Sequence, residues 1–120
     1  MPKLIEIPTF SDSRGDLTVI EKILPFDIKR VFFISNVDNS IRGNHRHHKT
    51  IQAAISISGK CIISNDNGHS VEHFELDAPN KCLIIQPEDF HWMHSFSENS
   101  ILLVLASEFF NPEDYVYEHY

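Results

Sequence analysis

Apolar and polar side chains alternate over many short segments of the chain, with the two-residue period of a half-buried strand. In residues 51–58, isoleucine or alanine at the odd positions alternates with glutamine, alanine and serine at the even ones. Residues 17–21 alternate in a similar way, and residues 29–35 are rich in β-branched and aromatic side chains. Residues 81–86 and 101–106 are nearly continuous apolar runs. This pattern predicts an all-β protein.

Turn-forming residues separate these segments. Asp66-Asn67-Gly68 lies between two predicted strands, residues 61–65 and 70–76, and its Asn-Gly step suits a tight hairpin. The best helical segment is short, residues 111–115, with Pro112 in its first turn. Many short strands with such punctuation indicate an antiparallel sandwich or barrel, and we expect a jelly roll that forms a single domain over residues 1–120. An immunoglobulin-like sandwich is the alternative, but its Cys…Trp…Cys pattern is missing.

Composition narrows the class of protein. Hydrophobic residues make up 42% of the 120 residues, which suffices for one packed core. The longest apolar runs are far shorter than the roughly 20 residues of a membrane helix, and we find no secretory leader, so we expect a cytoplasmic protein without membrane contact. A net charge of −7 argues against nucleic acid as a partner. Cys61 and Cys82 lie in apolar runs and are expected to be buried thiols.

The strongest chemical signal is the segment 42–49, Arg-Gly-Asn-His-Arg-His-His-Lys. On a strand, His45, His47 and Lys49 share one face. Continued alternation would place them on the same face as Ile51 and Ile55, so that the two histidines line the mouth of an apolar interior. A solvated polar strand is the alternative, but buried imidazoles need hydrogen-bond partners, which favours a site.

A second cluster lies in residues 87–94. His91 and His94 are three positions apart, so at most one of them faces inward from an extended segment, and we expect it to be His91. Phe90 and Trp92 flank this histidine, either as packing residues or as a platform for a flat ring.

A His-x-His pair with a later histidine first suggests a metal site. The spacing resembles the two-motif pattern of the cupin superfamily, which adds a glutamate four or five residues after the second histidine. Ile51 and Gln52 occupy those positions here. We therefore expect neither a metal nor another cofactor, and a metal-dependent small cupin enzyme stays the alternative. Metal-free imidazoles suit proton transfer, since their pKa lies near neutrality.

The whole chain resembles the nucleotide-sugar 3,4-ketoisomerases, small cupin enzymes that act on dTDP-4-keto-6-deoxyglucose. The motifs that carry this resemblance are Asp12-Ser13-Arg14-Gly15, Ile28-Lys29-Arg30-Val31, Arg42-Gly43-x-His45-x-His47-x-Lys49, His91-x-Met93-His94-x-Phe96-Ser97, Leu105-Ala106-Ser107 and Asp114-Tyr115. Two of these pieces are also similar to the 3,5-epimerases of dTDP-rhamnose synthesis, which gives a second function to weigh. A non-catalytic sugar-binding module is the third. Phe32-Phe33 departs from the family, whose members often carry tyrosine there.

The resemblance implies a cupin-type jelly-roll homodimer without metal, acting on a dTDP-linked 4-keto-6-deoxysugar. It implies that the keto group moves from C4 to C3, for later transamination in deoxyamino-sugar and polysaccharide biosynthesis. It makes His45 and His47 the catalytic residues, and we expect His47 to be the base and His45 its partner. Arg14 and Arg42 correspond to the arginines near the substrate phosphates.

Three further side chains complete the expected site. Lys49 is expected to stabilise the enediolate, because it shares the histidine face. His91 is expected to bind substrate, and Phe90 or Trp92 to stack on the thymine base.

Overall fold

A computed structural model describes residues 1–120. The chain forms twelve strands, β1 (Lys3–Glu6), β2 (Thr9–Asp12), β3 (Gly15–Thr18), β4 (Arg30–Ser35), β5 (Arg42–His47), β6 (Gln52–Ser58), β7 (Cys61–Asp66), β8 (Val71–Leu76), β9 (Lys81–Ile85), β10 (Phe90–His94), β11 (Ile101–Ala106) and β12 (Tyr115–Val116), and one 3₁₀ helix, η1 (Pro112–Asp114). The predicted all-β class is confirmed, and the predicted short helix is η1 with Asn111 as its N-cap. Sequence reasoning missed β1, β2 and β12.

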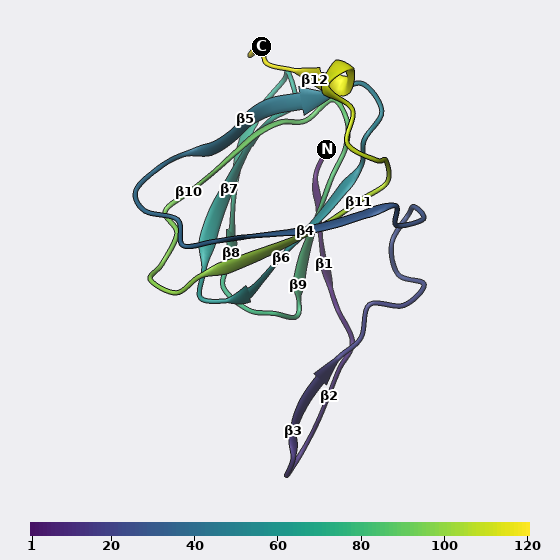
Figure 1. Cartoon of the computed structure of the whole chain (residues 1–120), viewed down its shortest axis with the longest axis vertical. Helices are drawn as coiled ribbons and strands as arrows, with labels where there is room; N and C mark the ends of the chain where they lie inside the picture. The colour runs from purple at the N-terminus through teal and green to yellow at the C-terminus, as the bar shows by residue number, and fades with distance from the viewer.

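Two antiparallel five-stranded sheets form the body of the molecule (Figure 1). One has the order β1-β9-β6-β11-β4, and the other has the order β12-β5-β10-β7-β8. β12 lies beside β5 at one end of the body, and the separate β2–β3 hairpin projects from the opposite end. This arrangement is the predicted jelly roll. No helix is long and apolar enough to cross a membrane.

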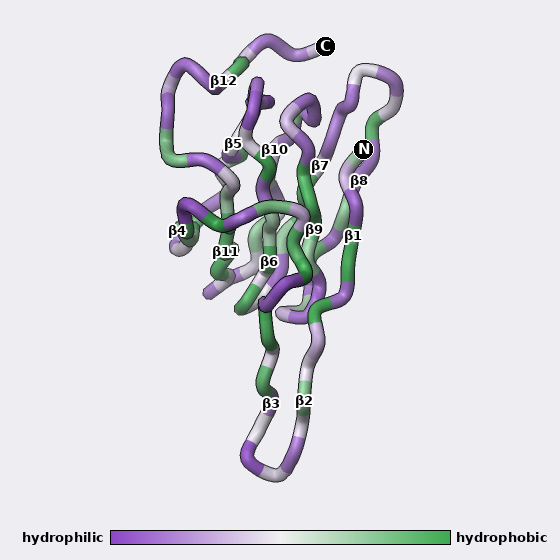
Figure 2. The backbone as a smooth tube through the Cα atoms, turned by 90° about the vertical axis from the view of Figure 1, so that its right-hand side faces the viewer, coloured by the Kyte–Doolittle hydropathy of each residue, from purple (hydrophilic) through white to green (hydrophobic).

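The core lies in two layers. The larger cluster fills the space between the sheets and includes Ile63, Leu83 and Val104. A smaller cluster, which includes Ala53 and Ile55, covers the outer face of the β6 sheet, where residues 20–26 pack against it. In Figure 2 the central strands are accordingly the most hydrophobic part of the tube. Both cysteines are free and buried, as predicted.

The predicted face of β6 is wrong. Gln52 and Ala54 line the interior cavity, whereas Ala53 and Ile55 belong to the outer cluster. β5 ends at His47, and the chain then crosses to the other sheet before β6 begins. The alternation of the histidine strand therefore does not continue into β6.

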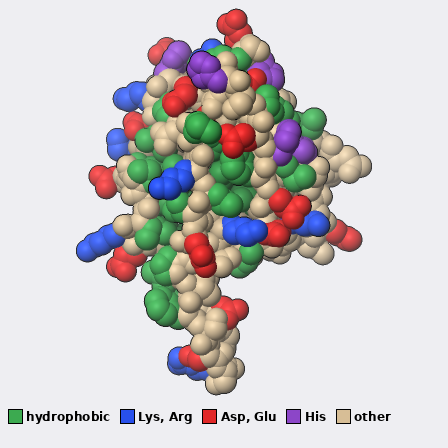
Figure 3. All heavy atoms as spheres, turned by 180° about the vertical axis from the view of Figure 1, so that it is seen from behind, with side chains coloured by type: hydrophobic (Ala, Val, Ile, Leu, Met, Phe, Trp, Pro, Cys, Tyr) green, Lys and Arg blue, Asp and Glu red, His purple; other side chains and the backbone are tan.

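The β2–β3 hairpin extends away from the body, with charged side chains at its tip (Figure 3). Phe10 and Leu17 face each other across the hairpin and are 64% and 63% exposed. At the tip, Arg14 pairs with Asp12 at 2.7 Å. No other part of this chain packs over Phe10 and Leu17 enough to bury them.

Leu83→Ala is expected to lower the free energy of unfolding by about 2–5 kcal/mol, because Leu83 is fully buried between the sheets and its truncation leaves a cavity. The matched control is Val71→Ala, since Val71 is 52% exposed, and its effect should stay within about 0.5 kcal/mol. Urea titrations measure both variants. Equal losses in the two would contradict the assignment of the core.

Candidate active site

Three histidines from two neighbouring strands meet on the inner face of the sheet. β10 pairs antiparallel with β5, which puts His91 directly opposite His45. The ring centroids of His45 and His91 lie 4.8 Å apart, and those of His45 and His47 lie 4.9 Å apart, both edge to face. His47 and His91 are 6.1 Å apart and stacked. The sequence predictions that His45 and His47 share a face and that His91 points inward are confirmed.

A β-bulge places an arginine on the same face as the histidines. The register between β5 and β10 shifts so that Gly43 pairs with Trp92 and Arg42 with Met93. Gly43 and Asn44 both adopt positive φ, at 88° and 59°. A Cβ at Gly43 would lie 3.0 Å from the carbonyl oxygen of His91, so glycine permits this close approach. The extra residue turns Arg42 inward, against the strict alternation of the strand.

The arginine and two of the histidines line a cavity of about 260 Å³ between the sheets. His45 and His91 form its polar wall, and His47 lies behind them, buried and away from the cavity. The other lining residues come mainly from β4, β6, β10 and β11, and they include Phe33, Ile34, Gln52, Ala54, Ile63, Ile85, Met93 and Val104. Of the two histidines of β5, the one that faces the cavity is therefore His45, and the expected base His47 does not line it.

Tyr115 and Arg30 complete the polar end of the cavity. The Tyr115 ring contacts both histidines of β5, with centroids 4.9 Å from His45 and 4.7 Å from His47. Its hydroxyl accepts a hydrogen bond of 3.4 Å from Nη1 of Arg30. The Arg30 guanidinium also lies 4.4 Å from the centre of the Phe32 ring. Sequence reasoning quoted Arg30 and Tyr115 within family motifs but assigned neither to the site.

Burial keeps the histidine cluster neutral. Desolvation lowers the pKa of His47 to about 4 and the pKa of His91 to about 3, and repulsion from His45 adds to both shifts. Desolvation also lowers the pKa of His45. The rings are therefore unprotonated near pH 7, and each keeps the free lone pair that a general base requires.

Hydrogen bonding determines which nitrogen of His91 carries the proton. Its Nδ1 lies 3.1 Å from the carbonyl oxygen of Asp89, which can only accept, so Nδ1–H donates. Nε2 is then the lone-pair nitrogen, and it is buried without a protein partner. The Asp89 side chain is itself fixed by the backbone N–H of Gln86 at 2.9 Å and by the Asn65 amide at 3.1 Å. His91 therefore presents a fixed acceptor.

Asp114 anchors η1 and β12 next to the histidines. Its carboxylate accepts hydrogen bonds from the backbone N–H groups of Lys49 and Thr50 and from the Thr50 hydroxyl. Burial opposes the ionisation of Asp114, but these bonds and the nearby His47 hold its pKa below the ordinary value. The carboxylate therefore connects the turn after β5 to the segment that carries Tyr115.

Two predicted site residues lie outside the cavity. The Lys49 side chain is 77% exposed and is 3.9 Å from Glu108, because β5 ends at His47 and the chain turns away before Lys49. The Arg14 side chain is 88% exposed at the hairpin tip. Within one chain, neither cation reaches the histidines.

The two expected aromatic platforms point the other way. Phe90 and Trp92 alternate with His91 and Met93 along β10, and only the latter two line the cavity. The Phe90 ring instead stacks on His119 at 4.2 Å on the outer face of the sheet. The prediction that Phe90 or Trp92 shares a site with His91 is wrong, because neighbouring residues of a strand point to opposite faces.

A jelly roll of this kind, with a histidine-lined cavity between its sheets, defines the class as a cupin-type fold. At 14% identity, a 3,5-epimerase from Legionella pneumophila shares this fold, with a TM-score of 0.83 over 99% of this chain and 73% of the other. The family model described as "FdtA: WxcM-like, C-terminal" matches residues 1–120, and the chain belongs to this family. The family resemblance inferred from the sequence motifs is thereby confirmed.

Relatives of higher identity carry one activity in their names. A TDP-4-oxo-6-deoxy-alpha-D-glucose-3,4-oxoisomerase of Aneurinibacillus thermoaerophilus is 36% identical, covering 98% of this chain and 86% of its own. The structure of a sugar 3,4-ketoisomerase from Thermoanaerobacterium thermosaccharolyticum in complex with TDP is 39% identical, with a TM-score of 0.94 and coverage of 98% and 88%. That of a TDP-quinovose 3,4-ketoisomerase from Campylobacter jejuni is 36% identical, with a TM-score of 0.93 and coverage of 98% and 92%.

Acid is expected to destabilise the protein through the buried histidines. An unfolded histidine binds a proton below pH 6.5, whereas folded His47 stays neutral down to about pH 4. The free energy of unfolding should therefore fall as the pH drops from 6.5 towards 4. At pH 5, His47→Asn should reduce that slope by about 1.2 kcal/mol per pH unit. Urea titrations between pH 7.5 and 4.5 measure the free energy of unfolding of both proteins. An equal pH dependence in wild type and His47→Asn would contradict the buried neutral state of His47.

Proposed function

We propose that this protein moves the keto group of a TDP-linked 4-keto-6-deoxyhexose from C4 to C3, and that the reaction takes place in the histidine-lined cavity. Family membership and the ketoisomerase relatives support the activity. A histidine-to-asparagine mutant of the T. thermosaccharolyticum ketoisomerase has been crystallised in complex with TDP-4-keto-6-deoxyglucose, which supports the substrate class. The observation that carries the assignment of the site is the neutral His45 ring on the wall of the cavity.

His45 is the proposed base. Its imidazole takes the proton from C3, and the electron pair of the C–H bond forms the C3–C4 double bond of an enediolate. A proton returned to C4 and the transfer of the O3 hydroxyl proton to O4 then give a ketone at C3 and a hydroxyl at C4. No atom is gained or lost, so the reaction needs no co-reactant. Positioned acid–base groups of this kind contribute roughly 10²–10⁴-fold to the rate.

The other polar groups have supporting roles in the proposal. His47 packs behind His45 and fixes the orientation of its ring. His91 packs against His45 in the cavity wall, and Arg42 binds the diphosphate, for which a planar guanidinium is well suited. The hydroxyl of Tyr115, held by Arg30, is a donor for the enediolate oxygens.

The enzyme is further proposed to act as a homodimer in the cytoplasm. The hairpin exposes Phe10 and Leu17, and β4 is an edge strand with an exposed Phe33 beside the cavity. A second copy of the chain that covers these surfaces would bury the apolar side chains. It would also give Arg14, which has no route to the cavity of its own chain, a second cavity to reach.

His45→Asn should lower the exchange of the C3 proton with deuterated water by about 10²–10⁴-fold while the affinity for TDP stays within about twofold. NMR of TDP-4-keto-6-deoxyglucose incubated with the protein measures both the exchange and the appearance of the 3-keto product. His48→Asn is the matched control, because His48 is exposed beyond the end of β5. Wild-type exchange in the His45 variant would rule out this base, and epimerisation with the ketone still at C4 would rule out the function.

Phe10→Asp and Leu17→Asp should convert the protein from a dimer to a monomer, since each places a charge in the proposed apolar contact. Size-exclusion chromatography with light scattering measures the mass. Asp16→Asn, an exposed polar change in the same hairpin, should leave the dimer intact. A monomeric wild-type protein would contradict the proposal.

A further inference from the structure

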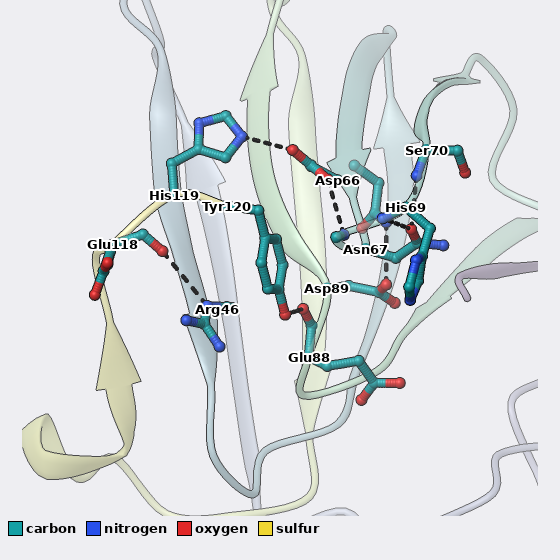
Figure 4. A network of polar contacts seen from close by, with 12 residues as sticks. Arg46, Asp66, Asn67, His69, Ser70, Glu88, Asp89, Glu118, His119 and Tyr120 are labelled. Carbon is teal, nitrogen blue, oxygen red and sulfur yellow. Dashed lines mark hydrogen bonds and ion pairs between the residues drawn. The ribbon is translucent and has the colours of Figure 1, made fainter.

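The residues that follow β12 lie across the outer face of the sheet that carries the histidines (Figure 4). We propose that His119 and Tyr120 form a C-terminal clip, which positions Tyr115 against His45 and His47. The clip would position residues for the proposed isomerase reaction, so its effect on turnover rests on the proposed function.

Tyr120 makes the first attachment of the clip. Its hydroxyl donates a 2.7 Å hydrogen bond to the carbonyl oxygen of Glu88, in the turn before β10. Its ring packs on the guanidinium of Arg46, whose Cζ lies 4.5 Å from the ring centre. The backbone of Gly68 also approaches the ring, since an added Cβ there would lie 3.3 Å from it. The ring thus contacts both β5 and the β7–β8 turn.

His119 makes the second attachment. Its Nε2 lies 3.0 Å from the Asp66 carboxylate at the end of β7. Its ring stacks on Phe90 of β10, with centroids 4.2 Å apart and an angle of 10° between the planes. The Trp92 ring is 5.5 Å away. The clip therefore contacts three strands of the sheet, of which β5 and β10 carry the three histidines.

The connection to the site runs through β12. This strand has only two residues, and they pair Tyr115 with His47 and Val116 with Arg46. Two residues of strand pairing add little stability, so the contacts of the flanking residues, before and after β12 in the chain, hold it in place. On one side, Asp114 binds the turn after β5. On the other side, Arg46 donates from Nε to the carbonyl oxygen of Glu118 at 3.4 Å.

The geometry divides the two faces of β5 between chemistry and support. His45 and His47 point inward, and Arg46 between them points outward to the clip. Loss of the clip frees one end of β12 and lets the Tyr115 ring leave its contacts with the two imidazoles. Turnover should fall because the reacting groups lose their relative positions, whereas Arg42 and its proposed phosphate contact are unaffected.

The test uses Tyr120→Ala, with Tyr120→Phe as the conservative variant and Glu118→Ala as the matched control. The control is suitable because only the backbone of Glu118 contacts Arg46. We expect kcat to fall about ten- to a hundredfold in Tyr120→Ala, with KM and the affinity for TDP within about twofold of wild type. Tyr120→Phe keeps the ring on Arg46 and should recover most of the loss. A changed KM or TDP affinity with an unchanged kcat would overturn the proposal.

A double-mutant cycle shows whether the clip acts through Tyr115. In a Tyr115→Phe background, and in Tyr115→Ala where turnover is still measurable, Tyr120→Ala should have much less further effect on kcat than in wild type. Fully additive losses in both backgrounds would mean that the clip acts elsewhere, which overturns the proposal. Should Tyr120→Ala fail to fold, Arg46→Lys, which removes the planar partner of the ring, takes its place in the cycle.

Two spectroscopic measurements test the clip separately from the proposed isomerase activity. Trp92 is the only tryptophan, so its fluorescence should report the departure of the neighbouring His119 ring. The imidazole proton resonances of His45 and His47 should shift when the Tyr115 ring leaves them. Both signals are independent of turnover, so they test the clip even in a protein without isomerase activity. Unchanged fluorescence and resonances in a folded Tyr120→Ala protein would overturn the clip.

Discussion

The site depends on the close packing of three imidazole rings, those of His45, His47 and His91. At a separation of 4.8 Å, two charged rings would repel each other by about 3–4 kcal/mol at the effective dielectric of a protein. Desolvation acts in the same direction, since burial penalises the charged form. The cluster is therefore stable only as neutral imidazole, which is also the form that can take a proton. The same crowding that keeps the rings uncharged therefore also keeps their lone pairs free.

The bulge in β5 is what allows one short strand to supply both a base and a cation. A regular strand would send Arg42 to the face opposite His45. Gly43 and Asn44, which both have positive φ, interrupt the alternation of side chains between the two faces of β5. Arg42 therefore points into the cavity. A side chain at Gly43 would meet the carbonyl of His91, so the glycine also permits the close contact between β5 and β10 that brings His45 and His91 together.

Much of the fold followed from periodicity, because the strands of the body are long enough to show alternation. The shared face of His45 and His47 followed for the same reason. Alternation predicts the wrong face for Lys49, Ile51 and Ile55, because the chain crosses between the sheets after His47 and a crossing has no periodic signal. Aromatic chemistry alone suggests Phe90 and Trp92 as platforms, but in β10 they lie on the face opposite His91. Tyr115 contacts the histidines through β12, a two-residue strand too short to show a pattern in the sequence.

The dependence of the site on β12 has a consequence for how the protein is made. The carboxylate of Asp114 binds a backbone amide 65 residues earlier in the chain. During synthesis, β5 leaves the ribosome long before this partner, and its edge waits without a neighbour. An open edge of this kind invites pairing with other nascent chains. The histidine strand is thus one of the segments that stay open to mispairing until translation has passed Tyr115.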